Sequence, residues 1–194
     1  MHLNSSPQHV RGDSSVRHRE DGVDLSQEEP ADWWEVEALY DLCFAPGRTA
    51  LSSYRLRDDV PPVAQLCLCL WDESDALAGV IRYWPIRVGG QSALLLGPVA
   101  VHPTRQGEGL AGLLIRESLK RARAAGWARV MLVGDYPYYR RFGFEKLEGV
   151  QMPPPTNPDR VLGLSLTPGA WTGVSGMVTR ATPQAAGHKD ATDP

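Results

Sequence analysis

The segment Ala93–Gly112, with the sequence ALLLGPVAVHPTRQGEGLAG, constrains the fold of this chain most strongly. Its first part, Ala93 to Val101, is almost wholly apolar and rich in Leu and Val, which is typical of a buried strand. His102-Pro103 ends this strand, because proline has no amide proton to donate to a ladder. A glycine-rich turn, Arg105 to Gly112, then leads into Leu110–Ala125, where leucines recur at helical spacing. The sequence therefore predicts a strand, a glycine loop and a helix in direct succession.

The start of this helix predicts a binding site for a phosphate or pyrophosphate. The first amides of a helix have no helical acceptor, and the helix macrodipole favours negative charge at that end. Gly107 and Gly109 carry no Cβ, so a phosphate could approach the backbone closely. Arg105 is expected to add a fixed positive charge at the rim of the loop.

Two known phosphate loops fit this turn poorly. A Walker loop ends in Gly-Lys-Ser/Thr, and no such sequence follows Gly112. Gly107, Gly109 and Gly112 do fit the G-x-G-x-x-G pattern of dinucleotide-binding folds, with Asp135 at roughly the expected ~20 residues beyond. That fingerprint directly follows its strand, however, whereas His102–Gln106 intervene here. A nucleotide-binding oxidoreductase stays an alternative on this pattern alone.

A third pattern fits the loop best. Gln106–Ala111 reads QGEGLA and resembles the Q/R-x-x-G-x-G/A loop of the GNAT acyltransferase superfamily. Further on, Tyr138–Phe144 reads YYRRFGF and resembles the FYxxxGF segment of the same superfamily, in the matching order and separation. The resemblance covers roughly Asp32 to Val178. Within the superfamily the chain looks most like the predicted N-acetyltransferases of the YhbS type.

The resemblance implies an α/β fold (an α+β mixed sheet), in which antiparallel strands precede a β-α-β unit with a splayed parallel strand pair. It implies an N-acetyltransferase that transfers an acetyl group from acetyl-CoA to a primary amine by direct attack in a ternary complex. A small molecule, a peptide N-terminus and a lysine are all open as acceptor. A non-catalytic CoA-binding sensor or partner module of the same fold is the alternative. No metal is expected, and a homodimer is compatible with the resemblance.

The same resemblance assigns a site. Tyr139 occupies the family's tyrosine position, where a phenol of reference pKa ~10 could protonate the departing thiolate. The alternative is that this side chain only packs beside Phe142 and Phe144. The implied acetyl-CoA site comprises Val99, Ala100 and Val101 of the strand, the loop residues Arg105, Gln106, Gly107, Glu108, Gly109, Leu110, Ala111 and Gly112, and Tyr139 itself.

The general base is not evident in the sequence. Many family members place a carboxylate on the strand before the loop, and Ala93–Val101 contains none. His102 and Asp135 are the nearest ionisable candidates, although His102 is also explained as a strand terminator. Gly97-Pro98 within the strand suits a β-bulge.

The other segments predict the rest of the domain. Asp32 is expected to cap a helix that starts at Trp33 and ends at Pro46-Gly47. Cationic and aromatic side chains follow it, and they either contact an acidic acceptor or lie on the surface; these are Arg48, Tyr54, Arg55 and Arg57. The predicted strands are Ala64–Trp71, Leu77–Val88 and Ser92–Val101, which are antiparallel, and Arg129–Val133, which is parallel to the third after a right-handed crossover.

Length and composition limit the alternatives. The chain has 194 residues, a formal net charge of −3 and 42% hydrophobic residues, as expected for one globular domain. The near-neutral charge argues against a nucleic-acid partner, and no apolar run could span a bilayer. Cys43, Cys67 and Cys69 lack metal-ligand spacing and are interpreted as reduced core residues of a cytoplasmic protein. The predicted division is a disordered tail over 1–30, the catalytic domain over 31–178 and a flexible tail over 179–194.

Overall fold

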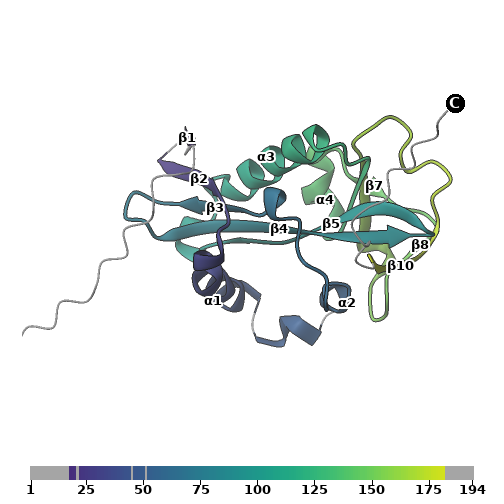
Figure 1. Ribbon diagram of the computed structural model, residues 1–194, viewed down its shortest axis with the longest axis horizontal. Helices are drawn as coiled ribbons and strands as arrows, with labels where there is room; N and C mark the ends of the chain where they lie inside the picture. Colours follow the sequence, from purple (N-terminus) through teal and green to yellow (C-terminus); the bar gives the residue numbers. More distant parts are fainter. Residues whose placement is uncertain (1–17, 21, 45, 51, 182–194) are drawn as a thin grey trace, which may run out of the picture.

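The computed structural model describes residues 18–20, 22–44, 46–50 and 52–181. In this part of the chain a single mixed sheet has the strand order β1-β2-β3-β4-β5-β6-β9-β7, and β10 pairs with both β4 and β8 (Figure 1). The strands are β1 His18–Glu20, β2 Val23–Gln27, β3 Leu68–Trp71, β4 Leu77–Val88, β5 Gln91–Val101, β6 Arg129–Val133, β7 Glu145–Lys146, β8 Val150–Gln151, β9 Val161–Ser165 and β10 Gly176–Arg180.

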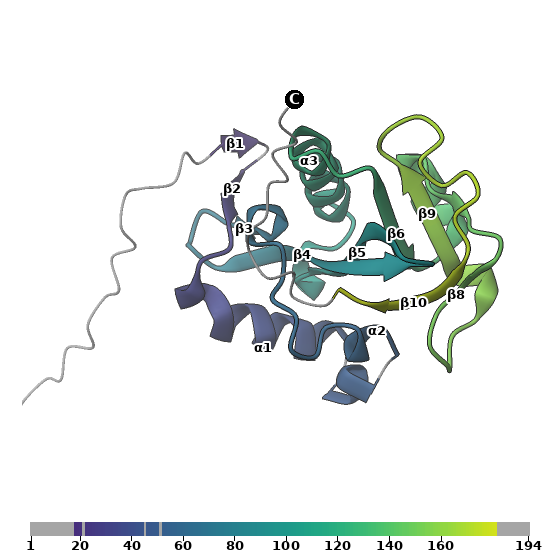
Figure 2. The ribbon, with the colours of Figure 1, turned by 45° about the vertical axis from the view of Figure 1, so that its right-hand side comes forward.

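The α-helices cover both faces of the sheet. They are α1 Trp33–Phe44, α2 Ser52–Arg55, α3 Leu110–Ala124 and α4 Tyr136–Tyr139. Helix α3 lies on one face, and α1 and α2 lie on the opposite face (Figures 1 and 2). Short 3-10 turns connect the elements: η1 Pro30–Asp32, η2 Pro46–Ala50, η3 Ala64–Leu66, η4 Pro103–Arg105, η5 Arg140–Phe142 and η6 Pro158–Arg160.

Alternating residues of the central strands build a core on each face. Ile81 of β4 is fully buried on the α3 face, where it packs in one cluster with Leu114 of α3. Its neighbour Val80 is fully buried on the opposite face, in a cluster with Val36 and Tyr40 of α1. This alternation is the period-2 pattern of a strand buried on both sides. The long hairpin β4–β5 is thus the scaffold against which α1 and α3 pack.

The β5 strand contains the expected bulge. Val99 pairs with Ile81 and Leu96 pairs with Tyr83, so three steps along β5 oppose two steps along β4. The extra residue falls at Gly97-Pro98, which confirms the bulge predicted there. A bulge bends the strand that carries it, and it does so here at the point where β5 has to leave its other neighbour.

That neighbour is β6, which runs parallel to β5 as predicted. The two strands pair only at Leu94 with Val130 and at Leu95 with Met131. Beyond Leu95 the β5 strand continues to Val101 without pairing to β6, so the parallel pair is splayed. The mixed sheet with this splay confirms the predicted fold class.

The domain begins earlier than the sequence indicated. The prediction that residues 1–30 are disordered is wrong for Val23–Gln27, because β2 pairs antiparallel with β3, Leu25 opposite Leu70. The two alternating apolar side chains Val23 and Leu25 are enough to hold β2 in the core, because the edge of β3 is available for strand pairing. Residues 1–17 lie outside the described part of the chain. At the other end β10 extends to Arg180, two residues beyond the predicted boundary, and 182–194 are again not described.

One local expectation was also wrong, and another, the helix start at Trp33 directly after Asp32, is confirmed. Ala64–Leu66 forms the turn η3, in which the Leu66 amide donates to the Val63 carbonyl at 2.8 Å, so the strand starts only at Leu68. Cys67 therefore ends that turn and lies outside β3, which contains Cys69, and both thiols are free and buried. Asp32 lies in the turn η1, where its carboxylate accepts the Glu29 amide at 2.9 Å, and α1 then begins at Trp33.

Candidate active site

Two cavities adjoin where β5 and β6 separate. The first, of about 530 Å³, follows the glycine loop and is called the loop groove; the second, of about 330 Å³, lies between the splayed strands and is called the splay cavity. Tyr138 lines both cavities, so they meet at this side chain. The loop groove is lined by Val101, Arg105, Gln106, Gly107, Gly109, Leu110, Ala111, Gly112, Arg116, Tyr138, Arg141 and Phe142.

The loop groove is built on the N-terminus of α3. Gly109 is the N-cap residue with φ 82°, and its carbonyl accepts the Leu113 amide at 3.1 Å. Gly107 also has a positive φ, 90°, in the left-handed region that glycine adopts without steric cost. A Cβ at either position would meet no atom within 4 Å, so the backbone of the loop faces open space. The helix is 15 residues long, and its first amides are directed at the groove's end.

The charge of the groove differs from the expectation. Arg105 was expected as a fixed positive charge, but its guanidinium binds the Glu108 carboxylate, Nη2 to Oε2 at 2.8 Å. This pairing raises the pKa of Arg105 and lowers the pKa of Glu108, and the two charges compensate each other. The cations that sequence analysis missed are Arg116 of α3 and Arg141 of η5, which both line the groove.

A local signal for Arg116 was available in the sequence. Arg116 follows Gly112 by one helical turn, so the two residues lie on the same face of α3. A Cβ at Gly112 would lie 3.2 Å from Nη1 of Arg116, which shows how closely the guanidinium covers this glycine. Arg141 had no such signal, because its position depends on the turn after α4 and on its stacking 4.3 Å from the centroid of the Tyr138 ring.

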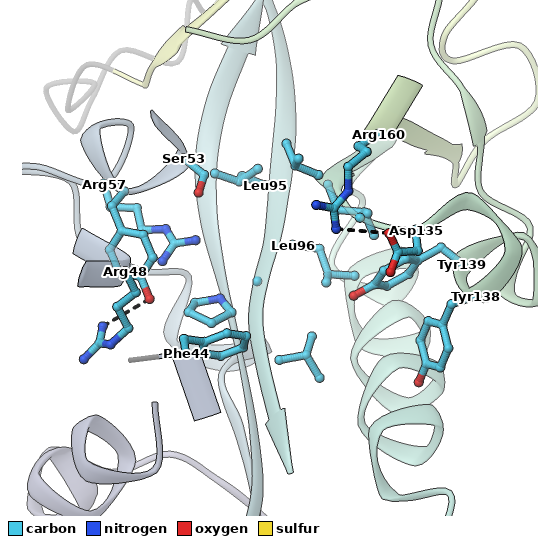
Figure 3. A pocket seen from close by; sticks show the side chains of 17 residues that line it. Phe44, Arg48, Ser53, Arg57, Leu95, Leu96, Asp135, Tyr138, Tyr139 and Arg160 are labelled. Atoms are coloured by element: carbon cyan, nitrogen blue, oxygen red, sulfur yellow. Dashed lines mark hydrogen bonds and ion pairs between the residues drawn. The ribbon is translucent and has the colours of Figure 1, made fainter. Parts of the chain in front are cut away.

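Tyr139 forms one wall of the splay cavity. Its ring contacts Tyr138, Phe142 and Phe144 with centroid distances of 5.0, 6.5 and 5.9 Å. Burial raises the pKa of the Tyr139 phenol to about 12, so the hydroxyl keeps its proton at neutral pH and can donate it. Figure 3 shows the hydroxyl pointing toward Leu96 on β5, whereas the hydroxyl of Tyr138 points away from it.

A carboxylate lies beside Tyr139. Asp135 lines the splay cavity and pairs with Arg160 at 3.1 Å between Oδ1 and Nη2 (Figure 3). Among the described residues that line this cavity it is the single acidic side chain. His102, the other ionisable candidate, lines neither cavity and places Nδ1 2.7 Å from the Thr104 hydroxyl. The structure thus brings one of the two candidate bases to the site.

The opposite wall comes from α1 and the segment after it. Arg48 is only 7% exposed and pairs with Glu37 at 2.6 Å and Asp41 at 2.9 Å. Arg57 lines the cavity with its guanidinium against aromatic rings, whereas Arg55 is exposed. The sequence left open whether these side chains contact an acidic acceptor or lie on the surface. Arg55 lies on the surface, whereas Arg48 and Arg57 do not.

Helix α1 also contacts β5 beyond the bulge. The Tyr40 hydroxyl donates to the Pro98 carbonyl at 3.3 Å, and the Cys43 thiol lies 3.4 Å from the Val101 carbonyl. The edge of β5 that faces the splay is not used for pairing with β6 in this segment. Apart from these two carbonyls, the backbone groups of this edge are therefore available to a ligand that runs between the two cavities.

The predicted cofactor residues separate into three groups. Val99 and Tyr139 line the splay cavity, and most of the loop residues line the groove. The side chain of Glu108 pairs with Arg105 and lines neither cavity. The side chain of Ala100 is buried on the α1 face, so only its backbone can contribute to a site between the strands. Assignment of these residues to a ligand stays a prediction.

This fold and this site define an acyltransferase of the GNAT type. The chain belongs to the acetyltransferase (GNAT) domain family, whose model matches residues 26–147. It is 32% identical over 118 residues to the uncharacterized N-acetyltransferase YhbS of Escherichia coli strain K12. The matched region covers 60% of this chain and 70% of the relative.

Solved structures extend the comparison. The crystal structure of E. coli YhbS in complex with CoA superposes with a TM-score of 0.72 and 26% identity, over 89% of this chain and 94% of that one. A GNAT family acetyltransferase from Brucella melitensis in complex with acetyl-CoA gives a TM-score of 0.62 and 28% identity, over 82% and 96%. Among the residues that the structure describes, no helix is both long and apolar enough to cross a membrane.

Proposed function

We propose that this protein transfers an acetyl group from acetyl-CoA to a primary amine by direct attack in a ternary complex. The observation that carries the proposal is the junction of the two cavities at Tyr138, with a helix N-terminus in one cavity and the partly buried Tyr139 in the other. The CoA and acetyl-CoA complexes of the two structural relatives support the choice of donor.

The loop groove fits the phosphate end of such a donor. The open backbone at Gly107 and Gly109 would hold the pyrophosphate together with the first amides of α3. Arg116 and Arg141 add positive charge to the same groove. The unpaired edge of β5 around Val99–Val101 would bind the amides of the pantetheine arm as an added strand would. The thioester supplies an activated acyl carbon at the splay.

The chemistry needs two proton transfers. The amine nitrogen attacks the thioester carbonyl carbon, a C–N bond forms, and the oxyanion that develops is stabilised by backbone amides of β5. Collapse of this intermediate breaks the C–S bond, and Tyr139 donates its proton to the departing sulfur. The proton released by the nitrogen passes to Asp135, directly or through water, and then restores the phenol. One proton leaves nitrogen and one arrives on sulfur, so the transfer balances.

Ligand-dependent thermal unfolding tests the donor first. The purified protein is unfolded with acetyl-CoA, CoA or NAD in parallel, and a ligand at 100 times its Kd should raise the free energy of unfolding by about 2.7 kcal/mol. Stabilisation by both CoA forms, together with release of free thiol when a primary amine is added, is expected. Stabilisation by NAD alone would overturn the proposal in favour of a dinucleotide site. Stabilisation by CoA without turnover of any amine would instead support a non-catalytic CoA-binding module.

A further inference from the structure

The side chain of Arg57 is held between two aromatic rings on the wall of the splay cavity opposite Tyr139. Its guanidinium carbon lies 4.0 Å from the centroid of the Tyr54 ring and 4.5 Å from that of Trp84. Figure 3 shows the guanidinium directed into the cavity, toward β5, and Asp135 and Tyr139 on the far side. Stacking of this kind orients a planar cation and leaves its N–H groups at the edge free for another partner.

Two nitrogens of the Arg57 guanidinium lack such a partner within the described chain. Nε and Nη1 are buried from solvent and make no hydrogen bond to any described residue. After burial, the pKa of Arg57 is affected most by Tyr54, through its charge and a side-chain hydrogen bond, and then by Tyr40 and Arg48; none of these is a carboxylate. Burial lowers the pKa of this guanidinium, yet an arginine stays protonated in proteins at ordinary pH. A buried charged donor without an acceptor is costly, and this cost points to a ligand that supplies one.

The other cations of the cavity are already compensated. Arg48 pairs with Glu37 and Asp41, and Arg160 pairs with Asp135. Arg57 is thus the uncompensated positive charge among the described side chains that line this cavity. One such charge matches one monoanionic group. A phosphate, with a charge of about −1.5 to −2, would leave an excess of negative charge.

The position of Arg57 also sets the geometry of an acceptor. The amine must reach the thioester near Tyr139, at the side of the cavity where β5 and β6 separate. Arg57 lies on the opposite side, and a cavity of about 330 Å³ separates them, which suits a molecule of amino-acid size. A molecule that spans this space would present an anionic group at one end and an amine at the other.

We propose that Arg57 binds a carboxylate of the acceptor, so that the acceptor is a small primary amine that carries a carboxylate. This inference rests on the proposed acetyl transfer and names the acceptor class that the transfer alone leaves open. Guanidinium and carboxylate form charge-assisted hydrogen bonds of complementary planar geometry. The role of Arg57 is acceptor specificity, separate from the loop groove that would hold the donor.

Matched acceptors test the inference. Acetyl transfer is measured for leucine, leucinamide and 3-methylbutylamine, and for the corresponding triplet built on phenylalanine. We expect kcat/KM for at least one carboxylated member to exceed that of its amide and its plain amine by tenfold or more. In Arg57→Gln the KM of that acid should rise at least tenfold and the preference should disappear, with the KM of acetyl-CoA unchanged. Arg57→Lys should retain part of the preference, because it keeps the charge and loses the planar fork.

Two controls keep the result interpretable. Arg55→Gln removes an exposed arginine two positions away and should change neither KM. Binding of the N-acetylated acids and of their amides to the CoA-saturated protein, measured by calorimetry, does not depend on turnover. Binding of an N-acetyl acid that requires Arg57, without turnover of any amine, would uphold the carboxylate site while the proposed transfer fails. Equal binding of acids and amides, a preference that survives in Arg57→Gln, or no binding of any acid would overturn the inference.

Discussion

The backbone of Gly134 lies directly against the ring of Tyr139. A Cβ built on Gly134 would collide with this ring, at 2.8 Å from Cδ2, and would lie equally close to Cδ1 of Leu132. Gly134 follows β6, and its amide donates to the Arg160 carbonyl at 2.9 Å, so the backbone itself is fixed. The absence of a side chain here is what allows the Tyr139 hydroxyl to reach the splay cavity.

Gly134→Ala should therefore displace the Tyr139 ring. We expect kcat to fall at least tenfold while the KM of acetyl-CoA changes little, and the free energy of unfolding to fall by about 1–3 kcal/mol, as is usual for overpacking. Steady-state kinetics and thermal unfolding measure the two effects. Gly47→Ala is the control, because a Cβ at that glycine meets nothing within 4 Å. Full kcat in Gly134→Ala would show that the ring position does not matter for turnover.

Gly109→Asp should abolish binding of CoA, because it places a negative charge in the loop groove where the pyrophosphate would bind. The matched control is Gly126→Asp, at the other end of the same helix. Both glycines have nearly equal φ, 82° and 81°, and a Cβ at either meets no atom within 4 Å. The two variants should thus lose comparable stability from backbone strain, and only Gly109→Asp should lose the stabilisation by CoA in thermal unfolding. Equal affinity in the two variants would contradict the assignment of the groove.

Tyr139→Phe should lower kcat by about 100-fold, at the lower end of the range for general acid catalysis, and leave the Kd of CoA unchanged. Steady-state kinetics and CoA titration measure these two quantities.

The raised pKa of the Tyr139 phenol also has a consequence for the stability of the folded protein. The folded protein keeps this proton up to about pH 12, whereas the unfolded chain loses it near pH 10. The phenol's contribution to stability is therefore complete below pH 10 and is lost between about pH 10 and 12. Denaturant unfolding across this range should show a shallower decline for Tyr139→Phe than for the parent chain.

The fold was largely predictable because its main signals are local. The hairpin β4–β5, the bulge at Gly97-Pro98 and the start of α3 after Gly109 follow from alternation, proline and glycine within short windows. The strand β2 was missed because it contributes only Val23 and Leu25 to the core. Its stability comes from β3, which lies more than forty residues away in the chain and could not be paired with it by a local pattern.

The candidate site was predictable only in part, for a related reason. Motif spacing indicated the loop and Tyr139, which both lie at the cavities. Spacing could not show that Glu108 neutralises Arg105, that Gly134 accommodates the Tyr139 ring, or that Arg57 is buried between two rings. Arg105 lies only three residues from Glu108, and Gly134 only five from Tyr139, but their contacts depend on the conformation of the intervening turns. The contact of Arg57 with Trp84 joins residues that are far apart in the chain.

A buried network of ion pairs links the N-terminal segment to the splay cavity. Arg82 of β4 binds Glu28 through Nε at 2.8 Å and Nη2 at 2.5 Å, and it binds Glu37 through Nη1 at 2.6 Å. Glu37 also binds Arg48, whose guanidinium donates to the Tyr54 hydroxyl at 3.1 Å on the cavity wall. The Arg82 and Glu28 side chains are only 10% and 13% exposed, so neither charge can be left to solvent.

Arg82→Met should reduce the free energy of unfolding by about 3–5 kcal/mol, because it leaves the Glu28 carboxylate buried without its cation. Adding Glu28→Gln to this variant should recover part of the loss, since the second change removes the stranded charge. The matched comparison is the exposed pair Lys146–Asp159, with 50% and 76% of its side chains accessible, where Lys146→Met should cost no more than about 1 kcal/mol. Denaturant unfolding of the four proteins measures these differences. A cost for Arg82→Met as small as that for Lys146→Met would mean that water reaches Glu28 readily, and that the network does not anchor the N-terminal strand to the sheet.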